Sequence, residues 1–214
     1  MQNKIPRLYI LDLLRGVAVF LMLLAHAVYF FHNRDNSFVL GLEKLGNTFC
    51  FITFLLVSGA ASYVAYLSQD QYQHNKKRII NKILLTLFAY YLIAIFVQSK
   101  EIIFADSYSK IKILSEILSL QLLPSYTEYI VPFIIFPLLL VLLAKYFIEI
   151  SRSLGKIILV SALFYLAGYI IYHIDFPQFL IPWKALLTGN DGYYRFPIFQ
   201  YLPVYLLGLY WGKN

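Results

Sequence analysis

The chain has 214 residues, of which 60% are hydrophobic and only 14% are charged. A soluble domain of this size needs roughly a quarter of its residues charged, so the composition excludes an ordinary soluble protein. The net charge of +7 does not indicate nucleic-acid binding, because the basic residues stand in short groups between apolar blocks, as membrane topology requires.

Six apolar blocks are long enough to cross a hydrocarbon core of about 30 Å. Near the start of the second block, Asn47 is expected to cap the helix, with a role in orienting His26 as the alternative. Pro132 and Pro137 are expected to kink the first half of the fourth. The predicted spanning helices cover residues 8–31, 45–67, 79–97, 129–147, 154–172 and 196–211.

Two further apolar segments are too short or too interrupted to span. Residues 110–123 carry Lys110, Lys112 and Glu116, and residues 176–187 contain two prolines and a lysine. Both are typical of interfacial or re-entrant helices. The predicted fold class is therefore all-α, a polytopic membrane helical bundle with about six transmembrane helices and two short interfacial or re-entrant helices. We expect residues 1–214 to form one integral membrane domain, either complete or the N-terminal part of a longer protein.

Every second connection between the predicted spans is basic, whereas the others balance their charges. The positive-inside rule then places the N-terminus in the cytoplasm, and the chain in the plasma membrane if it is bacterial. The basic residues of these connections are Lys4 and Arg7, then Lys76, Lys77, Arg78 and Lys82, and finally Lys145, Arg152 and Lys156.

Three polar residues, Asp12, Arg15 and His26, lie inside the first span, where polar groups are costly. At 100° per residue, Arg15 and His26 differ by about 20° around the axis, and Asp12 lies about 40° from His26. One interpretation is an ion pair between Asp12 and Arg15, with His26 bonding to another helix. The other assigns Arg15 to an anionic ligand and His26 to proton transfer, which suits a side chain that titrates near neutral pH.

The same helix carries a family pattern: Arg7, the Leu-Asp-x-x-Arg-Gly box at residues 11–16, and then His26. It resembles the first helix of the transmembrane acyltransferase superfamily, which includes acyltransferase family 3 and the heparan-alpha-glucosaminide N-acetyltransferase-like proteins. Residues 54–59, Phe-Leu-Leu-Val-Ser-Gly, are similar to the family's F-x-x-x-S-G motif. The helix with Pro203, Gly208 and Gly212 resembles a later helix of the heparan-type branch. Two departures stand out: members usually have about ten or eleven spans, and the later polar residues of the acyl-acceptor region have no match.

The resemblance implies a membrane O- or N-acyltransferase that takes an acyl group, most simply acetyl, from cytoplasmic acyl-CoA. It implies a carbohydrate-type acceptor, a glycan or glycolipid, and hence a role in polysaccharide modification. His26 would be the catalytic residue. The donor and substrate would be bound by Arg15, Asp12, Lys77, Arg78 and Ser58.

Several of these residues have a second interpretation. The basic cluster from Lys76 to Lys82 either sets the topology alone or also holds the phosphates of the donor. Ser58 and Gly59 form either a small-residue packing contact or part of the site. Glu128 is either a carboxylate facing the acceptor or a solvated acid at a helix start.

Other classes of function remain open at this stage. The polar face of the first helix also suits a small membrane transporter or channel, and a non-enzymatic scaffold is a third hypothesis. No metal-ligand spacing or glycine-rich phosphate loop occurs, so no metal cofactor is expected. The expected partners are the lipid bilayer, acyl-CoA and the acceptor, and a homo-oligomer is compatible with the sequence.

Overall fold

The computed structural model describes residues 9–31, 36–67, 72–124, 127–190 and 193–214, and within these ranges it contains helices and no β-strand. The predicted all-α fold class is confirmed. A π-helical turn (Tyr63–Leu67) follows α2, and 3-10 turns (Glu128–Ile130 and Gln178–Leu180) precede α6 and α8. The helices are α1 (Tyr9–Phe31), α2 (Ser37–Ser62), α3 (Tyr72–Val97), α4 (Ser99–Phe104), α5 (Ser107–Leu118), α6 (Pro132–Ile150), α7 (Leu154–His173), α8 (Ile181–Thr188) and α9 (Ile198–Lys213).

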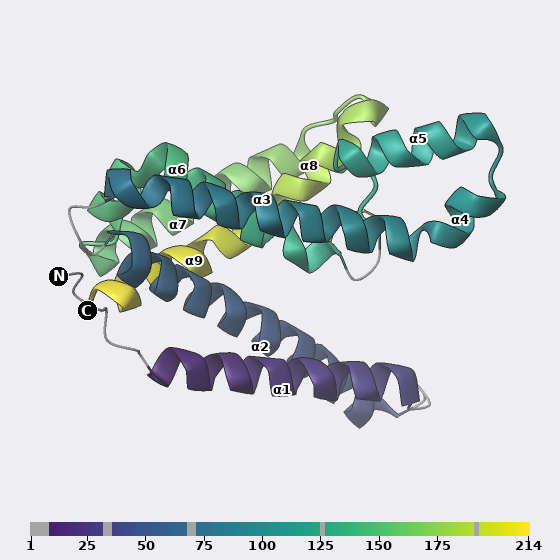
Figure 1. The fold of residues 1–214 in the computed structure, drawn as a ribbon. Coiled ribbons are helices and arrows are strands. Elements are labelled where there is room, and N and C mark those ends of the chain that lie inside the picture. The colour runs from purple at the N-terminus through teal and green to yellow at the C-terminus, as the bar shows by residue number, and fades with distance from the viewer. Residues whose placement is uncertain (1–8, 32–35, 68–71, 125–126, 191–192) are drawn as a thin grey trace.

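Five segments of the described chain are long and apolar enough to cross a membrane. The sixth predicted span corresponds to α9, whose 16 residues are about 24 Å long, less than a hydrocarbon core of about 30 Å. Figure 1 shows that α1 begins and α9 ends at the same end of the bundle. Thus α9 brings the chain back to the end from which α1 starts. The five apolar segments are Tyr9–Val28, Ser37–Leu67, Asn75–Val97, Glu128–Ile150 and Leu154–His173.

The second helix begins earlier than the hydropathy pattern predicts. Asn36 is its N-cap, and the Asn36 side-chain oxygen accepts a hydrogen bond from the Phe38 amide at 2.9 Å. Asn47 lies inside the helix, so the prediction that it caps α2 was wrong. The predicted span from residue 45 leaves Glu43 and Lys44 in the preceding connection, whereas the Asn36 cap and the apolar neighbours of this pair extend the helix through it.

The two short segments form helices close to the predicted positions. Asp106 caps α5 by accepting hydrogen bonds from the amides of Tyr108 and Ser109, and hydrogen bonding from Ser109 holds the pKa of the Asp106 carboxyl below its usual range. Figure 1 shows α4 and α5 as a hairpin that extends beyond the end of α3. Phe104 and Ile111 in this hairpin are largely exposed, as expected of helices at a membrane interface.

The fourth predicted span forms α6, but its distortion is not where the prolines predict it. Pro132 occupies the first turn, where its missing N–H costs nothing, and Pro137 lies inside the helix. The non-helical backbone is found at Leu143 (φ −119°, ψ 24°), in the second half. The expected kink in the first half is therefore replaced by a break six residues after Pro137.

The centre of the molecule is the crossing of α2 and α9, where glycines bring the two backbones into contact. A Cβ atom on Gly208 would lie 2.1 Å from the Leu56 carbonyl oxygen, and one on Gly59 would lie 2.3 Å from the Tyr205 carbonyl oxygen. Likewise, a Cβ atom on Gly212 would lie 2.4 Å from the Ala60 carbonyl oxygen. Of the two interpretations of the Ser58–Gly59 pair, the packing contact therefore holds for Gly59.

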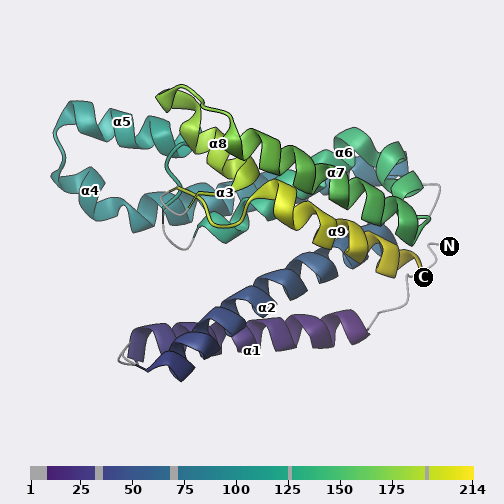
Figure 2. The ribbon, with the colours of Figure 1, turned by 180° about the vertical axis from the view of Figure 1, so that it is seen from behind.

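The first helix stands at the edge of the bundle and packs against α2. The contact uses small residues: Ala18 and Ala25 are buried, and Gly46 of α2 faces Ala25, whose Cβ would lie 3.1 Å from a Cβ added there. In Figures 1 and 2, α1 and α2 lie close where α2 begins and diverge toward the other end. The polar N-terminal half of α1 therefore lies apart from α2, at the end of the bundle where α3 begins.

Candidate active site

The polar side chains of α1 lie beside its packing surface, not within it. Ala25 faces α2, and His26 is the next residue, about 100° further around the helix. Asp12 and His26 are half-buried, whereas Arg15 is exposed. The polar face of α1 is thus formed as the spacing predicted, and it runs along one edge of the α1–α2 contact.

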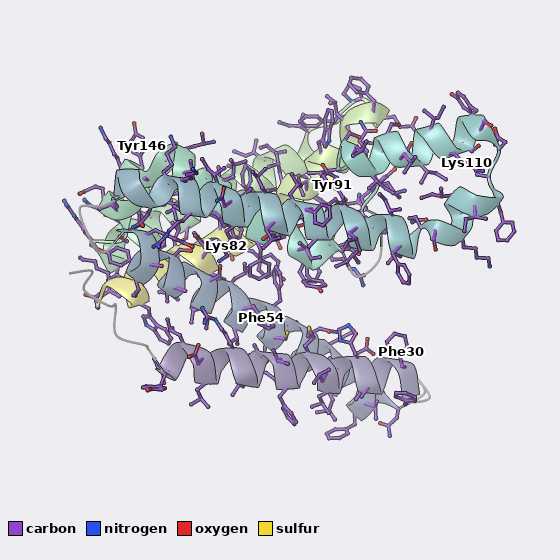
Figure 3. The ribbon with its side chains drawn as sticks, viewed as in Figure 1. Phe30, Phe54, Lys82, Tyr91, Lys110 and Tyr146 are labelled. Atoms are coloured by element: carbon purple, nitrogen blue, oxygen red, sulfur yellow. The ribbon has the colours of Figure 1, made fainter. Side chains whose placement is uncertain are left out.

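His26 has a defined orientation because its ring bonds to its own helix. Nδ1 lies 2.8 Å from the Met22 carbonyl oxygen, one turn earlier, and the ring stacks on Phe30 at 6.4 Å between centroids. A carbonyl oxygen can only accept, so in the neutral ring Nδ1 carries the proton and Nε2 is the basic nitrogen. Figure 3 shows Phe30 near the end of α1 that is remote from Arg15. The arrangement fits a histidine that accepts a proton through Nε2.

Arg15 and Asp12 form an ion pair, with Arg15 Nη1 3.1 Å from Asp12 Oδ1. This is the local interaction that a spacing of three residues favours, and it confirms that part of the conservative interpretation. An exposed pair of this kind stabilises a protein little, by about 0 to 1 kcal/mol. The pair therefore does not by itself explain why a charge is placed inside an apolar helix.

Across from α1, the start of α3 presents further cations. Lys82 lies within electrostatic interaction range of Arg15, and Arg78 lies within range of Tyr66. Figure 3 shows Lys82 on the side of α3 that faces α2 and α1. Arg15, Lys82 and Asp12 together place two positive charges against one negative charge. An anion bound between Arg15 and Lys82 would offset the repulsion between these two cations.

The other predicted binding residues lie in different places. Arg78 is about 40° from Lys82 around α3, whereas Lys77 is about 140° away and points to another side of the helix. Ser58 is half-buried on α2, next to the glycine that contacts α9. The roles of Lys77 and Ser58 in binding stay predictions. Lys82, a topology or phosphate candidate from the sequence, interacts electrostatically with Arg15.

A second polar contact, between Glu128 and Arg195, lies at the opposite end of the bundle. Glu128 is buried, and its Oε2 accepts from the Arg195 amide at 3.2 Å while its Oε1 accepts from Arg195 Nη2 at 3.0 Å. Of the two interpretations of Glu128, the solvated acid is wrong, because the carboxylate is removed from solvent and is paired with the Arg195 side chain and backbone. Sequence reasoning missed this pair, since the partners are 67 residues apart.

No group of three or more His, Cys, Asp or Glu side chains within the described part of the chain is placed to hold a metal ion. Cys50 is buried inside α2 and unpaired. Among the described residues, α1 and the start of α3 therefore offer an imidazole and a group of cations as chemical groups. This combination suits acid–base catalysis on a substrate that carries negative charge.

Comparison with known proteins identifies the family. The sequence profile described as "Heparan-alpha-glucosaminide N-acetyltransferase, catalytic" matches residues 7–214, which include the whole polar face of α1. No curated protein and no solved structure gives a significant match. With five helices long and apolar enough to span, the chain is an integral membrane protein. The chain belongs to the heparan-alpha-glucosaminide N-acetyltransferase catalytic family of membrane N-acetyltransferases.

Proposed function

We propose that the protein transfers an acetyl group from acetyl-CoA to an amine or hydroxyl of a carbohydrate-type acceptor. The family match supports the acetyl transfer. Arg15 and His26 share one face of α1 and lie about 16 Å apart along it, and this observation supports donor binding by Arg15 and proton transfer by His26. This separation suits a long donor whose charged part binds at Arg15 while its thioester reaches His26.

In the proposed reaction, Nε2 of His26 takes the proton from the acceptor as its nitrogen or oxygen attacks the thioester carbonyl. The new C–N or C–O bond forms, the C–S bond breaks, and the CoA thiolate leaves. The imidazolium then returns the proton to the thiolate. The bond from His26 Nδ1 to the Met22 carbonyl oxygen holds the ring in the tautomer that this step needs.

The donor phosphates are proposed to bind between Arg15 and the start of α3. Arginine holds phosphate through a planar fork of N–H donors, and Lys82 adds a point charge from the facing helix. Arg78 extends the same positive face, and Asp12 orients Arg15 through their ion pair. Lys77 and Ser58 are retained as proposed contacts at the edge of this region.

The proposed function is tested with purified full chain in detergent or proteoliposomes. Acetyl-CoA labelled in the acetyl group is added, first alone to measure binding and then with glucosaminide acceptors to measure transfer. We expect saturable binding and a labelled acceptor. Folded protein that neither binds acetyl-CoA nor labels any acceptor would contradict the proposal.

Removing either facing cation is expected to weaken the donor complex. Arg15→Ala and Lys82→Gln should each raise the Kd for acetyl-CoA about 10- to 100-fold, the equivalent of one charge-assisted hydrogen bond. Arg15→Lys should restore little of the lost affinity, because the point charge of an ammonium group does not replace the planar fork of guanidinium N–H donors. Isothermal titration measures the effect, with Lys145→Gln on α6 as the matched control. Unchanged affinity in both Arg15→Ala and Lys82→Gln would exclude this donor site.

We further propose that α1 begins on the cytoplasmic side of the plasma membrane. The basic connections before α3 and between α6 and α7 support this orientation. In a variant without Cys50, a cysteine at Gln73 should resist an impermeant maleimide added from outside, whereas a cysteine at Asp175 should react. The reverse pattern would invert the proposed orientation and place the donor site on the other face.

A further inference from the structure

A cavity of about 510 Å³ lies between the second half of α7, the end of α8 and the start of α9, well away from α1. Figure 2 shows α7 and α9 side by side on this face of the bundle. Its walls are mainly aromatic, and Gly168 leaves room among them. The aromatic side chains that line it are Phe164, Tyr165, Tyr169, Tyr172 and Phe199.

The cavity opens toward the surroundings of α7. Three of its tyrosines recur at spacings of four and three residues, so they share one stripe of the helix, and each is more than half exposed: Tyr165, Tyr169 and Tyr172. Because α7 is one of the helices long and apolar enough to cross a membrane, an exposed stripe on it is accessible to lipid. A lipid of the bilayer can therefore reach the cavity from this side.

Two polar side chains that line the cavity, Tyr165 and Gln200, donate hydrogen bonds to backbone carbonyl oxygens of the protein. The Tyr165 hydroxyl donates to the Gln200 carbonyl oxygen at 3.2 Å, and the Gln200 side-chain amide donates to the Thr188 carbonyl oxygen at 3.5 Å. These two donors need no polar ligand, and an apolar chain fits against the aromatic walls.

A cation stands beside this apolar space. Lys184 lies one turn before Thr188 on α8, and its Nζ lies 5.7 Å from the centre of the Tyr172 ring. One of its three N–H donors is used by the Ile174 carbonyl oxygen at 2.8 Å, which leaves two for an anionic group. The protein binds a hydrocarbon chain no more strongly than the surrounding lipid does. A charged anchor of this kind is therefore what makes such a site selective for one class of lipid.

We propose that this cavity is a binding site for a glycerophospholipid of the bilayer. One acyl chain lies along the aromatic walls formed by α7 and α9, and the phosphate accepts hydrogen bonds from Lys184. The site is separate from the proposed acetyl-transfer site, which lies on α1 and α3. A phospholipid bound in the cavity would contact α7, α8 and α9 together. Without it, the contact among these helices depends on few buried residues of α7.

The test uses a photoreactive phosphatidylglycerol with a diazirine in one acyl chain, in proteoliposomes of the full chain. Cross-links mapped by mass spectrometry should concentrate on residues 164–172 and 199–200. Gly168→Leu fills the cavity and should abolish these cross-links. Gly168→Ala should keep them, because its Cβ would meet Phe199 at an ordinary 3.5 Å.

Gly155→Leu, in the same helix but with only a serine hydroxyl near its Cβ position, is the matched control and should keep the cross-links. Lys184→Gln tests the anchor without filling the cavity, and it should reduce phospholipid retained in native mass spectra, whereas Lys213→Gln should not. Cross-links spread evenly over all spanning helices, or unchanged in Gly168→Leu and Lys184→Gln, would overturn the site. Labelling by a photoreactive polyprenyl phosphate but not by the phospholipid would overturn the choice of ligand.

Discussion

Replacing His26 by alanine is expected to lower the rate of acetyl transfer by about 10² to 10⁴, the usual contribution of a positioned general base. The donor should still bind, because its proposed cationic contacts lie about 16 Å away at Arg15 and beyond. The rate is measured with labelled acetyl-CoA under single-turnover conditions, and donor affinity by titration in the same preparation.

Two further variants separate the base from its structural bond. His26→Asn retains an N–H donor that can reach the Met22 carbonyl oxygen but has no basic nitrogen, so it should be as inactive as alanine. His173 on α7 makes the same kind of bond, from Nδ1 to the Tyr169 carbonyl oxygen at 2.9 Å. His173→Ala should therefore keep its activity. Near-normal transfer by His26→Ala would mean that His26 is a packing residue and that the proposed mechanism is wrong.

Gly208→Leu is expected to disrupt the fold, because it places a side chain where α2 and α9 touch. Even the Cβ atom would lie 2.1 Å from the Leu56 carbonyl oxygen and 3.0 Å from the Cα of Gly59. Backbone atoms cannot rotate away as a flexible side chain can, so the two helices must separate. Gly208→Ala alone should cost about 1 to 3 kcal/mol, the range seen when a well-packed core is overfilled.

Gly41→Ala on α2 is the matched control, since nothing lies within 4 Å of its Cβ position. In a helix this change is neutral or slightly favourable, by up to about 1 kcal/mol. Thermal unfolding in detergent, followed by size-exclusion chromatography, compares the variants. If Gly208→Ala and Gly41→Ala were equally stable, the close crossing of α2 and α9 would not be a major source of stability.

Local sequence determined the helices and the polar face of α1. Whether a segment favours hydrocarbon depends on its own side chains, so each predicted span corresponds to a helix, although α2 and α3 begin seven to eight residues earlier than predicted. The common face of Arg15 and His26 follows from the fixed 100° step of a helix. The start of α2 differs from the prediction because the charged pair Glu43–Lys44 interrupts the apolar block, although the cap at Asn36 decides where the helix begins.

Only the tertiary structure decided which distant residues meet. Four cations stand near the start of α3 in the sequence, and in the structure Lys82 interacts electrostatically with Arg15. Glu128 finds Arg195 67 residues away, and Gly59 meets Gly208 across the α2–α9 crossing. Inside a membrane, lipid tails are as apolar as the side chains, so helix pairing depends on close packing and polar contacts between particular surfaces. Those surfaces exist only once the helices are assembled, and hydropathy along the chain does not encode them.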